Sequence, residues 1–430
     1  MPAGRMSRFL RGKPMQKRTR KKSWRRVLLI FTAVLVGLAA VVGVGGYLYL
    51  RNSEWWVAIT LFHDDYRATN FRTMHELFPA RKVPAGGQVW ELPSAAGGPV
   101  ALPETYRFNG EERSLVAFLD ESETTGLLVL RDGVISHESY YQGNDASSRA
   151  QSFSMAKSVI SALVGIATEE GHIRSVYDAI SDYVPELRGS GYDGVSIHDV
   201  LTMSSGVDFD EDYDNFRSDI MWLPVRVFGF QEAAPDILAE LGRKREPGTY
   251  NEYVSSDSIA LGLLVAQATG VPVAHYLSEK IWLPAGMEHS AWWNTDHHGN
   301  ELGHAFLGAT VRDYGRLGLL YLNGGRRGDR SGDSGEIMPA RWIHDSVNPT
   351  EAHLQPGENP DSFWTFGYGY QWWIPEQPDG EFVAIGIWGQ YIYVYPRYRT
   401  VIVKTSTDYD FDTRDHETIE VFRAIARGSS

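Results

Sequence analysis

The longest apolar stretch of the chain lies close to its start. Residues 27–50 contain no charged side chain, and an arginine stands at each end of them. A helix needs about 20 consecutive apolar residues to cross a bilayer core, so these 24 residues are long enough to span it. Tyr47 and Tyr49 lie where aromatic side chains border a membrane. The pattern therefore predicts one transmembrane helix over residues 27–50.

Further along, apolar residues recur at the spacing of an α-helix. Val159, Ile160, Leu163, Val164 and Ala167 fall on one helical stripe, and the run closes near residue 171. Similar spacing between polar, proline or glycine boundaries predicts further helices over residues 178–184, 195–201, 259–268, 310–321 and 413–426.

Strand-like runs stand before and after these helices. Residues 126–130 and 134–141 flank Asp132-Gly133, a dipeptide typical of a two-residue hairpin turn. Three more runs, 382–388, 391–395 and 400–404, lie near the end of the chain. Strands at both ends with helices between them predict an α/β (α+β) fold. We expect an antiparallel sheet built from the N- and C-terminal parts of the domain, flanked by helices, with a mainly helical insertion subdomain.

These patterns divide the chain into four parts. We expect a basic cytoplasmic tail (1–26), a transmembrane signal anchor (27–50), a membrane-proximal linker or extension (51–115) and a folded domain (116–430). The linker is assigned from its turn-rich composition and its prolines. The helical subdomain is expected over about residues 175–365.

Charge is distributed unevenly and predicts the orientation of the anchor. Residues 1–26 hold 11 Lys and Arg and no acid, whereas the rest of the chain has 30 basic and 54 acidic residues, a net of −24. The positive-inside rule places the tail in the cytoplasm and the folded domain outside, at a bacterial inner membrane crossed once. A cleaved signal peptide is the alternative, but its apolar core would be shorter. A domain this acidic is not expected to bind nucleic acid.

The first candidate catalytic residues lie at the start of the helix predicted around residue 159. Ser154 and Lys157 stand three positions apart, so both side chains lie on one helical face. A serine hydroxyl needs an adjacent base to become a nucleophile, and a lysine serves only if burial or neighbouring cations lower its pKa. Such a tetrad also arises by chance at a solvated helix start. Tyr253, directly before a predicted helix, suits either packing or a second general acid and base.

Together these motifs resemble the serine β-lactamase/penicillin-binding-protein superfamily. The chain looks closest to its class C-like branch, with esterases and 6-aminohexanoate-dimer hydrolases. The resemblance covers about residues 116–430 and rests on Ser154-Met155-Ala156-Lys157, residues 198–206, Pro247-Gly248 leading to Tyr253-Val254-Ser255, residues 310–318, and Gly386-Ile387-Trp388-Gly389-Gln390.

The resemblance implies a role for each matched residue. Ser154 would be acylated after Lys157 takes its proton. Tyr253 would relay a proton to the leaving group, with Ser255 beside it. The oxyanion hole would use the N–H groups of Ser154 and of Ile387. The remaining matched or neighbouring positions, all expected to contact substrate or to shape the oxyanion strand, are Gly386, Trp388, Gln390 and Tyr213.

One departure from the family pattern bears on the substrate. β-Lactamases and D-Ala-D-Ala peptidases carry Lys/His-Ser/Thr-Gly on the strand where this chain has Ala384-Ile385-Gly386. That cation holds the substrate carboxylate, so strong β-lactamase activity is not expected here. Lys404-Thr405-Ser406 looks like a substitute, but it follows the strand pair and is interpreted as unrelated.

The sequence thus predicts a membrane-anchored extracytoplasmic serine hydrolase that cleaves small amides or esters through an acyl-enzyme, without metal or organic cofactor. One alternative is a carboxypeptidase- or β-lactamase-like enzyme acting on peptidoglycan or β-lactams. The other is a non-catalytic binding or sensor protein on the same fold. The natural substrate and the oligomeric state stay open.

Overall fold

The structure is a computed structural model that describes residues 20–51, 53, 56, 60–96, 98, 100–328 and 335–428. The chain divides into two compact units between residues 57 and 58. The first unit contains helix α1 (Arg20–Arg51), and its segment Trp24–Arg51 is long and apolar enough to cross a membrane. Every side chain of that segment is exposed within the chain itself. Residues 1–19 of the predicted tail lie outside the described residues.

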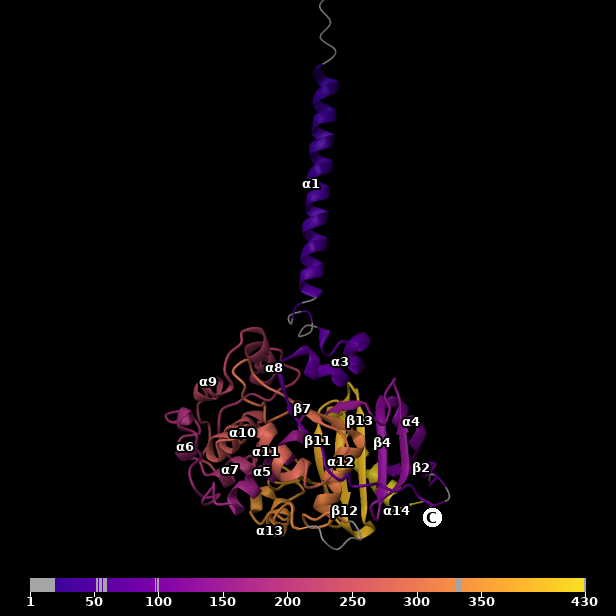
Figure 1. The fold of residues 1–430 in the computed structure, drawn as a ribbon, viewed down its shortest axis with the longest axis vertical. Helices are drawn as coiled ribbons and strands as arrows, with labels where there is room; N and C mark the ends of the chain where they lie inside the picture. Colours follow the sequence, from indigo (N-terminus) through magenta and orange to yellow (C-terminus); the bar gives the residue numbers. More distant parts are fainter. Residues whose placement is uncertain are drawn as a thin grey trace, which may run out of the picture. The chain divides into compact units, whose positions relative to one another are not determined.

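The second unit is built on a seven-stranded antiparallel sheet that brings together the strands predicted at the two ends of the folded domain (Figure 1). At the predicted hairpin turn, Asp132 and Gly133 have φ angles of 51° and 75°, as a type I′ hairpin requires. The predicted fold class is confirmed. The strand order is β5 (Val134–Tyr140), β4 (Thr124–Arg131), β13 (Thr400–Ser406), β12 (Gln390–Tyr395), β11 (Phe382–Gly386), β10 (Trp373–Ile374) and β9 (Gly367–Tyr368).

Helices account for most of the remaining regular structure of this unit, and most of them lie between β5 and β9. They are α3 (Asp64–Leu77), α4 (Leu115–Glu121), α5 (Met155–Glu169), α6 (Ile180–Tyr183), α7 (Ile197–Leu201), α8 (Asp219–Pro224), α9 (Ala234–Ala239), α10 (Ser255–Thr269), α11 (Val273–Leu277), α12 (Val311–Leu322), α13 (Ala340–Val347) and α14 (Phe411–Arg427).

Helices cover both faces of the large sheet, which is why its central strands are apolar on both sides. On one face α12 comes very close: a Cβ built at Gly315 would lie 2.8 Å from Leu128, and one at Gly318 would lie 2.5 Å from Val401. On the other face α4 and α14 share a core with the alternate strand residues. These are Leu127, Val129, Tyr391, Tyr393, Tyr395 and Ile402.

A smaller sheet joins three distant parts of the chain. Its order is β1 (Ala80–Val83), β7 (Ala291–Asn294), β8 (Leu307–Thr310) and β6 (Arg149–Gln151). Thus the insertion predicted to be mainly helical also contributes two strands. The extension predicted before residue 116 supplies β1, together with α3 and a separate hairpin of β2 (Thr105–Phe108) and β3 (Glu111–Ser114). Since α5 follows β6 directly, this sheet helps to fix the start of α5.

Candidate active site

Ser154 stands at the N-terminus of α5 and contacts Lys157 directly. The Lys157 Nζ atom lies 2.9 Å from the Ser154 Oγ atom. Phe153, just before the serine, has a φ of 41°, a left-handed conformation that is uncommon outside glycine and turns the chain sharply into the helix. The Ser154 hydroxyl makes no capping bond to the helix, so it remains free for Lys157 and for a ligand.

The Lys157 ammonium group is enclosed by protein. Lys157 is 1% exposed, and Nζ lies 3.2 Å from the Ser255 hydroxyl and 2.9 Å from the His304 carbonyl oxygen. Burial lowers the pKa of Lys157 to about 7, although the carboxylates of Glu211 and Asp257 oppose the shift. A large share of the lysine is therefore neutral near pH 7 and able to accept a proton.

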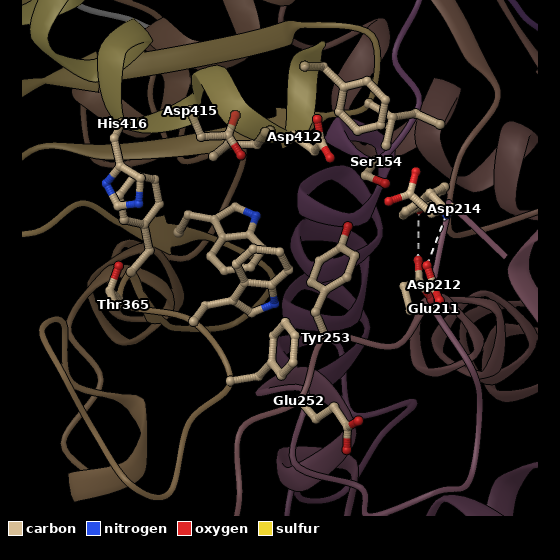
Figure 2. Close-up of a pocket in the computed structure, with 18 of the residues that line it drawn as sticks. Ser154, Glu211, Asp212, Asp214, Glu252, Tyr253, Thr365, Asp412, Asp415 and His416 are labelled. Atoms are coloured by element: carbon tan, nitrogen blue, oxygen red, sulfur yellow. Dashed lines mark hydrogen bonds between the residues drawn. The ribbon is translucent and has the colours of Figure 1, made fainter. Parts of the chain in front are cut away.

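Tyr253 comes from the turn before α10 and approaches the same serine. Its hydroxyl points toward Ser154 in Figure 2. The Lys157 Nζ atom lies 4.9 Å from the centre of the Tyr253 ring. Burial raises the pKa of the Tyr253 hydroxyl well above its ordinary value, so the phenol keeps its proton near neutral pH. The structure thus brings together the three predicted catalytic residues.

Gly386 allows the end of β11 to touch the loop that carries the serine. A Cβ built at Gly386 would lie 2.4 Å from the Ser152 carbonyl oxygen and 3.0 Å from the Ser154 nitrogen. Ile387 follows and lines the same cavity as Ser154. Within the part of the chain that the structure describes, neither the Ser154 nor the Ile387 N–H donates to another residue. Both amides are thus available to an oxyanion.

Ser255 is the first residue of α10 and was expected to lie beside Tyr253 in the site. The N-cap of α10 is Val254, and no side chain caps this helix, because the Ser255 hydroxyl donates elsewhere. It donates to the Glu211 Oε1 atom at 2.6 Å, and the Ser255 N–H donates to Oε2 at 2.7 Å. Glu211 is not among the residues that the sequence motifs single out.

Tyr213 lies on the same loop and lines the cavity, as expected. Its hydroxyl donates to Glu211 Oε1 at 2.8 Å, and burial raises its pKa well above the ordinary value. The signal that could have led to Glu211 is its position two residues before Tyr213, which on an extended loop places both side chains on one side.

Two other predicted residues support the strand end and do not line the main cavity. Gln390 is buried, and its amide donates to the carbonyl oxygens of Trp388 at 2.9 Å and Ser406 at 2.7 Å. Trp388 has a φ of 64°, and its ring stacks on Phe62 with 5.2 Å between centroids. Trp388 was expected to contact substrate or to shape the oxyanion strand. Its ring contacts both the segment before α3 and, with 5.8 Å between ring centres, Phe411 of the cavity wall.

The cavity beside Ser154 has a volume of about 490 Å³. Ile385 and Ile387 form part of its wall, and aromatic side chains including Trp364, Trp373 and Phe411 form much of the rest. No lysine or arginine occurs among the described residues that line it. Carboxylates line it from three segments. Asp210, Glu211, Asp212 and Asp214 come from the loop before α8, Glu252 from the turn before α10, and Asp412 and Asp415 from the start of α14. All but Asp210 are labelled in Figure 2.

Lys404 does not supply the missing cation. It is 1% exposed on the central strand β13, donates a hydrogen bond to Ser406, and does not line the cavity. Its Nζ atom lies 5.7 Å from the ring centre of Phe118, on the sheet face covered by α4. Across the described ranges, no group of three or more His, Asp or Glu side chains is arranged to hold a metal ion.

This fold combines a seven-stranded antiparallel sheet with a mainly helical insertion. The beta-lactamase family model matches residues 113–424, and the chain belongs to this family. It is 30% identical to a 6-aminohexanoate-dimer hydrolase of Paenarthrobacter ureafaciens over 304 residues, which cover 69% of this chain and 76% of the relative.

Solved structures show the same architecture. A candidate 6-aminohexanoate-dimer hydrolase from Bacillus anthracis superposes with a TM-score of 0.74 at 25% identity, covering 85% of this chain and 95% of its own. A class C beta-lactamase superposes with a TM-score of 0.53 at 18% identity, covering 72% of this chain and 93% of its own. The predicted family resemblance is confirmed.

Proposed function

We propose that the protein is a membrane-anchored serine hydrolase that cleaves amide or ester bonds through an acyl-enzyme on Ser154. The observation that carries the proposal is the 2.9 Å contact between the Ser154 hydroxyl and the buried Lys157 amine. Lys157 would take the hydroxyl proton while Oγ attacks the carbonyl carbon, and the N–H groups of Ser154 and Ile387 would hold the oxyanion. Tyr253 would protonate the leaving amine or alcohol and recover a proton from Lys157. Water would then release the acid.

Activity-based labelling tests this proposal. The full-length chain in detergent would be treated with a fluorophosphonate probe, digested and mapped by mass spectrometry. We expect the label on Ser154. A chain that hydrolyses no ester and takes no label would instead be a binding or sensor protein on this fold.

The charge of the cavity supports a preference among substrates. The relative from Paenarthrobacter ureafaciens is named as a 6-aminohexanoate-dimer hydrolase, and a linear dimer of that amino acid has a free amine at one end and a carboxylate at the other. In this chain the described cavity lining contains carboxylates and no lysine or arginine. Burial raises the pKa of Asp415 to about 7, and a bound ammonium group would favour its charged form. We propose linear amides or esters that carry an amine, in preference to substrates that carry a carboxylate.

A matched pair of esters tests this preference. We expect p-nitrophenyl 6-aminohexanoate to be hydrolysed with a kcat/KM about ten- to a hundredfold higher than the mono-p-nitrophenyl ester of adipic acid, because one charge-assisted contact contributes roughly 1.5–3 kcal/mol. Nitrocefin, which carries a carboxylate, should be turned over as slowly as the adipate ester. Equal rates for all three would contradict the charge argument.

A lysine introduced into the cavity wall should increase nitrocefin turnover in the same measurement. Ile385 lines the cavity, whereas Ala384 is buried on the strand and does not. Ile385→Lys should therefore raise the ratio of nitrocefin to amino-ester turnover, and Ala384→Lys should not. Selective loss of nitrocefin turnover in Lys404→Ala would mean that β13 supplies the substrate-binding cation after all.

The anchor and its orientation form the second part of the proposal. They are supported by the apolar segment Trp24–Arg51 and by the 11 basic residues before residue 27. We propose a single-pass protein of a bacterial inner membrane whose hydrolase unit is extracytoplasmic.

Reporter fusions test the orientation. An enzyme that is active only outside the cytoplasm should be active when fused after Leu50 and inactive when fused before Val27. Mass analysis of the membrane-bound protein should find residues 1–50 still attached. The opposite activity pattern would overturn the orientation, and a mature chain beginning beyond Leu50 would show a cleaved signal instead of an anchor.

A further inference from the structure

The Lys157 amine has three neighbours, and only one of them should give it a proton. These are the Ser154 hydroxyl at 2.9 Å, the Ser255 hydroxyl at 3.2 Å and the His304 carbonyl oxygen at 2.9 Å. A neutral lysine amine has two hydrogens and one lone pair. As a base it works only if the lone pair faces Ser154. The other two neighbours must therefore accept the two hydrogens.

The His304 carbonyl oxygen can only accept, but a serine hydroxyl can either accept or donate. If the Ser255 hydroxyl pointed its proton at Lys157, it would occupy the lone pair and compete with Ser154. Glu211 prevents this. The Ser255 proton is directed to Glu211 Oε1 at 2.6 Å, so toward Lys157 the Ser255 oxygen is left as an acceptor.

Glu211 is itself held in place by two more donors. The Ser255 N–H donates to its Oε2 atom at 2.7 Å, and the Tyr213 hydroxyl donates to its Oε1 atom at 2.8 Å. Three donors converge on this carboxylate, which makes it an acceptor at both oxygens. The hydrogen-bond direction therefore runs from Lys157 through Ser255 to Glu211.

We propose that Glu211 is a positioning residue for the general base: by fixing the Ser255 hydroxyl, it aims the Lys157 lone pair at Ser154. This inference rests on the proposed function and extends it to a residue that does not itself touch the reacting atoms. It predicts that Glu211→Gln, the uncharged isostere, lowers kcat/KM more than Glu211→Asp, the shorter acid.

Glu211→Gln is expected to reverse the direction of the hydrogen bond between Ser255 and residue 211. The backbone N–H of Ser255 cannot stop donating, so the new amide must turn its oxygen toward it. The amide NH₂ then faces the Ser255 oxygen, and the Ser255 proton is released toward Lys157. Glu211→Asp keeps two acceptor oxygens and the charge at a shorter reach.

The charge of Glu211 gives a second readout. The groups that face Lys157 are Glu211 from the loop before α8, Asp257 from α10, His304 from the loop before β8 and the Tyr253 ring. The two carboxylates raise the pKa of Lys157 against the effect of burial. Burial raises the pKa of Glu211 itself, whereas Lys157 and the donors from Ser255 and Tyr213 favour its charged form. Loss of that charge should lower the pKa of Lys157, so the rise of kcat/KM with pH should begin at a lower pH.

The experiment measures kcat/KM for p-nitrophenyl butyrate against pH with the full-length chain in detergent. The wild-type acid limb is expected near pH 7, the value to which burial brings Lys157. Glu211→Gln should lower the plateau value of kcat/KM on the order of tenfold and shift the acid limb of the pH profile to lower pH. Glu211→Asp should lose less activity and keep the acid limb at the wild-type pH. Asp208→Asn, which removes an exposed carboxylate of the same loop outside the cavity, should change neither.

A double-mutant cycle separates positioning from a general loss of structure. In a Ser255→Ala background no hydroxyl remains to be directed, so adding Glu211→Gln should leave the plateau within about twofold. The inference is overturned if Glu211→Gln lowers the plateau equally in both backgrounds, or if it leaves both plateau and limb unchanged. Fluorophosphonate labelling of the wild type separates the proposed function from the role of Glu211. If wild-type Ser154 takes no label, the proposed function is wrong. If the wild type is labelled but the Glu211 variants keep wild-type kinetics, only the role of Glu211 is wrong.

Discussion

Ser154→Ala is expected to abolish covalent labelling by a fluorophosphonate and to lower ester turnover by a factor on the order of 10³ or more. The hydroxyl is the group that would form the acyl bond, and Lys157 and Tyr253 both converge on it. Without the oxygen, both partners keep their positions but have no nucleophile to activate. The check is kcat for p-nitrophenyl butyrate together with intact-protein mass after labelling.

The chain offers a matched control on the same helix. Ser161 is a fully buried serine of α5 whose hydroxyl has no hydrogen-bond partner among the described residues. Ser161→Ala removes the same atom from α5 and should leave labelling and turnover at the wild-type level. A label that persists in Ser154→Ala, or that maps to another serine, would show that the nucleophile has been assigned to the wrong residue.

Gly386→Ala should produce the second-largest loss, a fall in kcat of about a hundredfold or more with a smaller change in KM. The added methyl group would lie 2.4 Å from the Ser152 carbonyl oxygen and 3.0 Å from the Ser154 nitrogen. Both contacts are backbone, so the end of β11 must move away and carry the Ile387 N–H with it. Loss of one oxyanion donor costs roughly 3–4 kcal/mol in the transition state. Steady-state kinetics with the butyrate ester provide the measurement.

A second glycine serves as the comparison for this substitution. A Cβ built at Gly242 meets no atom within 4 Å, and Gly242 has no positive φ. Gly242→Ala should therefore leave kcat unchanged. If Gly386→Ala also retained full kcat with a normally folded chain, the strand end would not be supplying an oxyanion donor.

The elements that could be predicted from sequence are those fixed by neighbouring residues. Asp132-Gly133 carries its own turn preference, because both positions need positive φ angles that few other residue pairs adopt readily. Helix α5 follows from an apolar stripe within one segment. The contact of Ser154 with Lys157 follows from helix geometry alone, since three residues bring two side chains onto one face.

Other parts of the site depend on segments that are distant in sequence. Glu211 reaches Ser255 across 44 positions, and the His304 carbonyl reaches Lys157 across 147. A carboxylate in a polar loop looks solvated until the fold buries it against a helix start. Trp388 packs on Phe62 and Phe71 from the segment around α3, which is far from it in the sequence. No local pattern carries that information.

The sequence by itself determined the apolar N-terminal helix, the hairpin, the helix that begins beside Ser154 and the alternation of strands and helices. Each of these depends on periodicity or on a turn preference within a few residues. The tertiary structure alone decided the depth at which Lys157 is buried, and with it a pKa of about 7. It also decided the direction of the Ser255 hydroxyl and the carboxylate-lined cavity beside Ser154. The physical reason is that desolvation and hydrogen-bond direction depend on which distant groups surround an atom, and only the folded chain sets those neighbours.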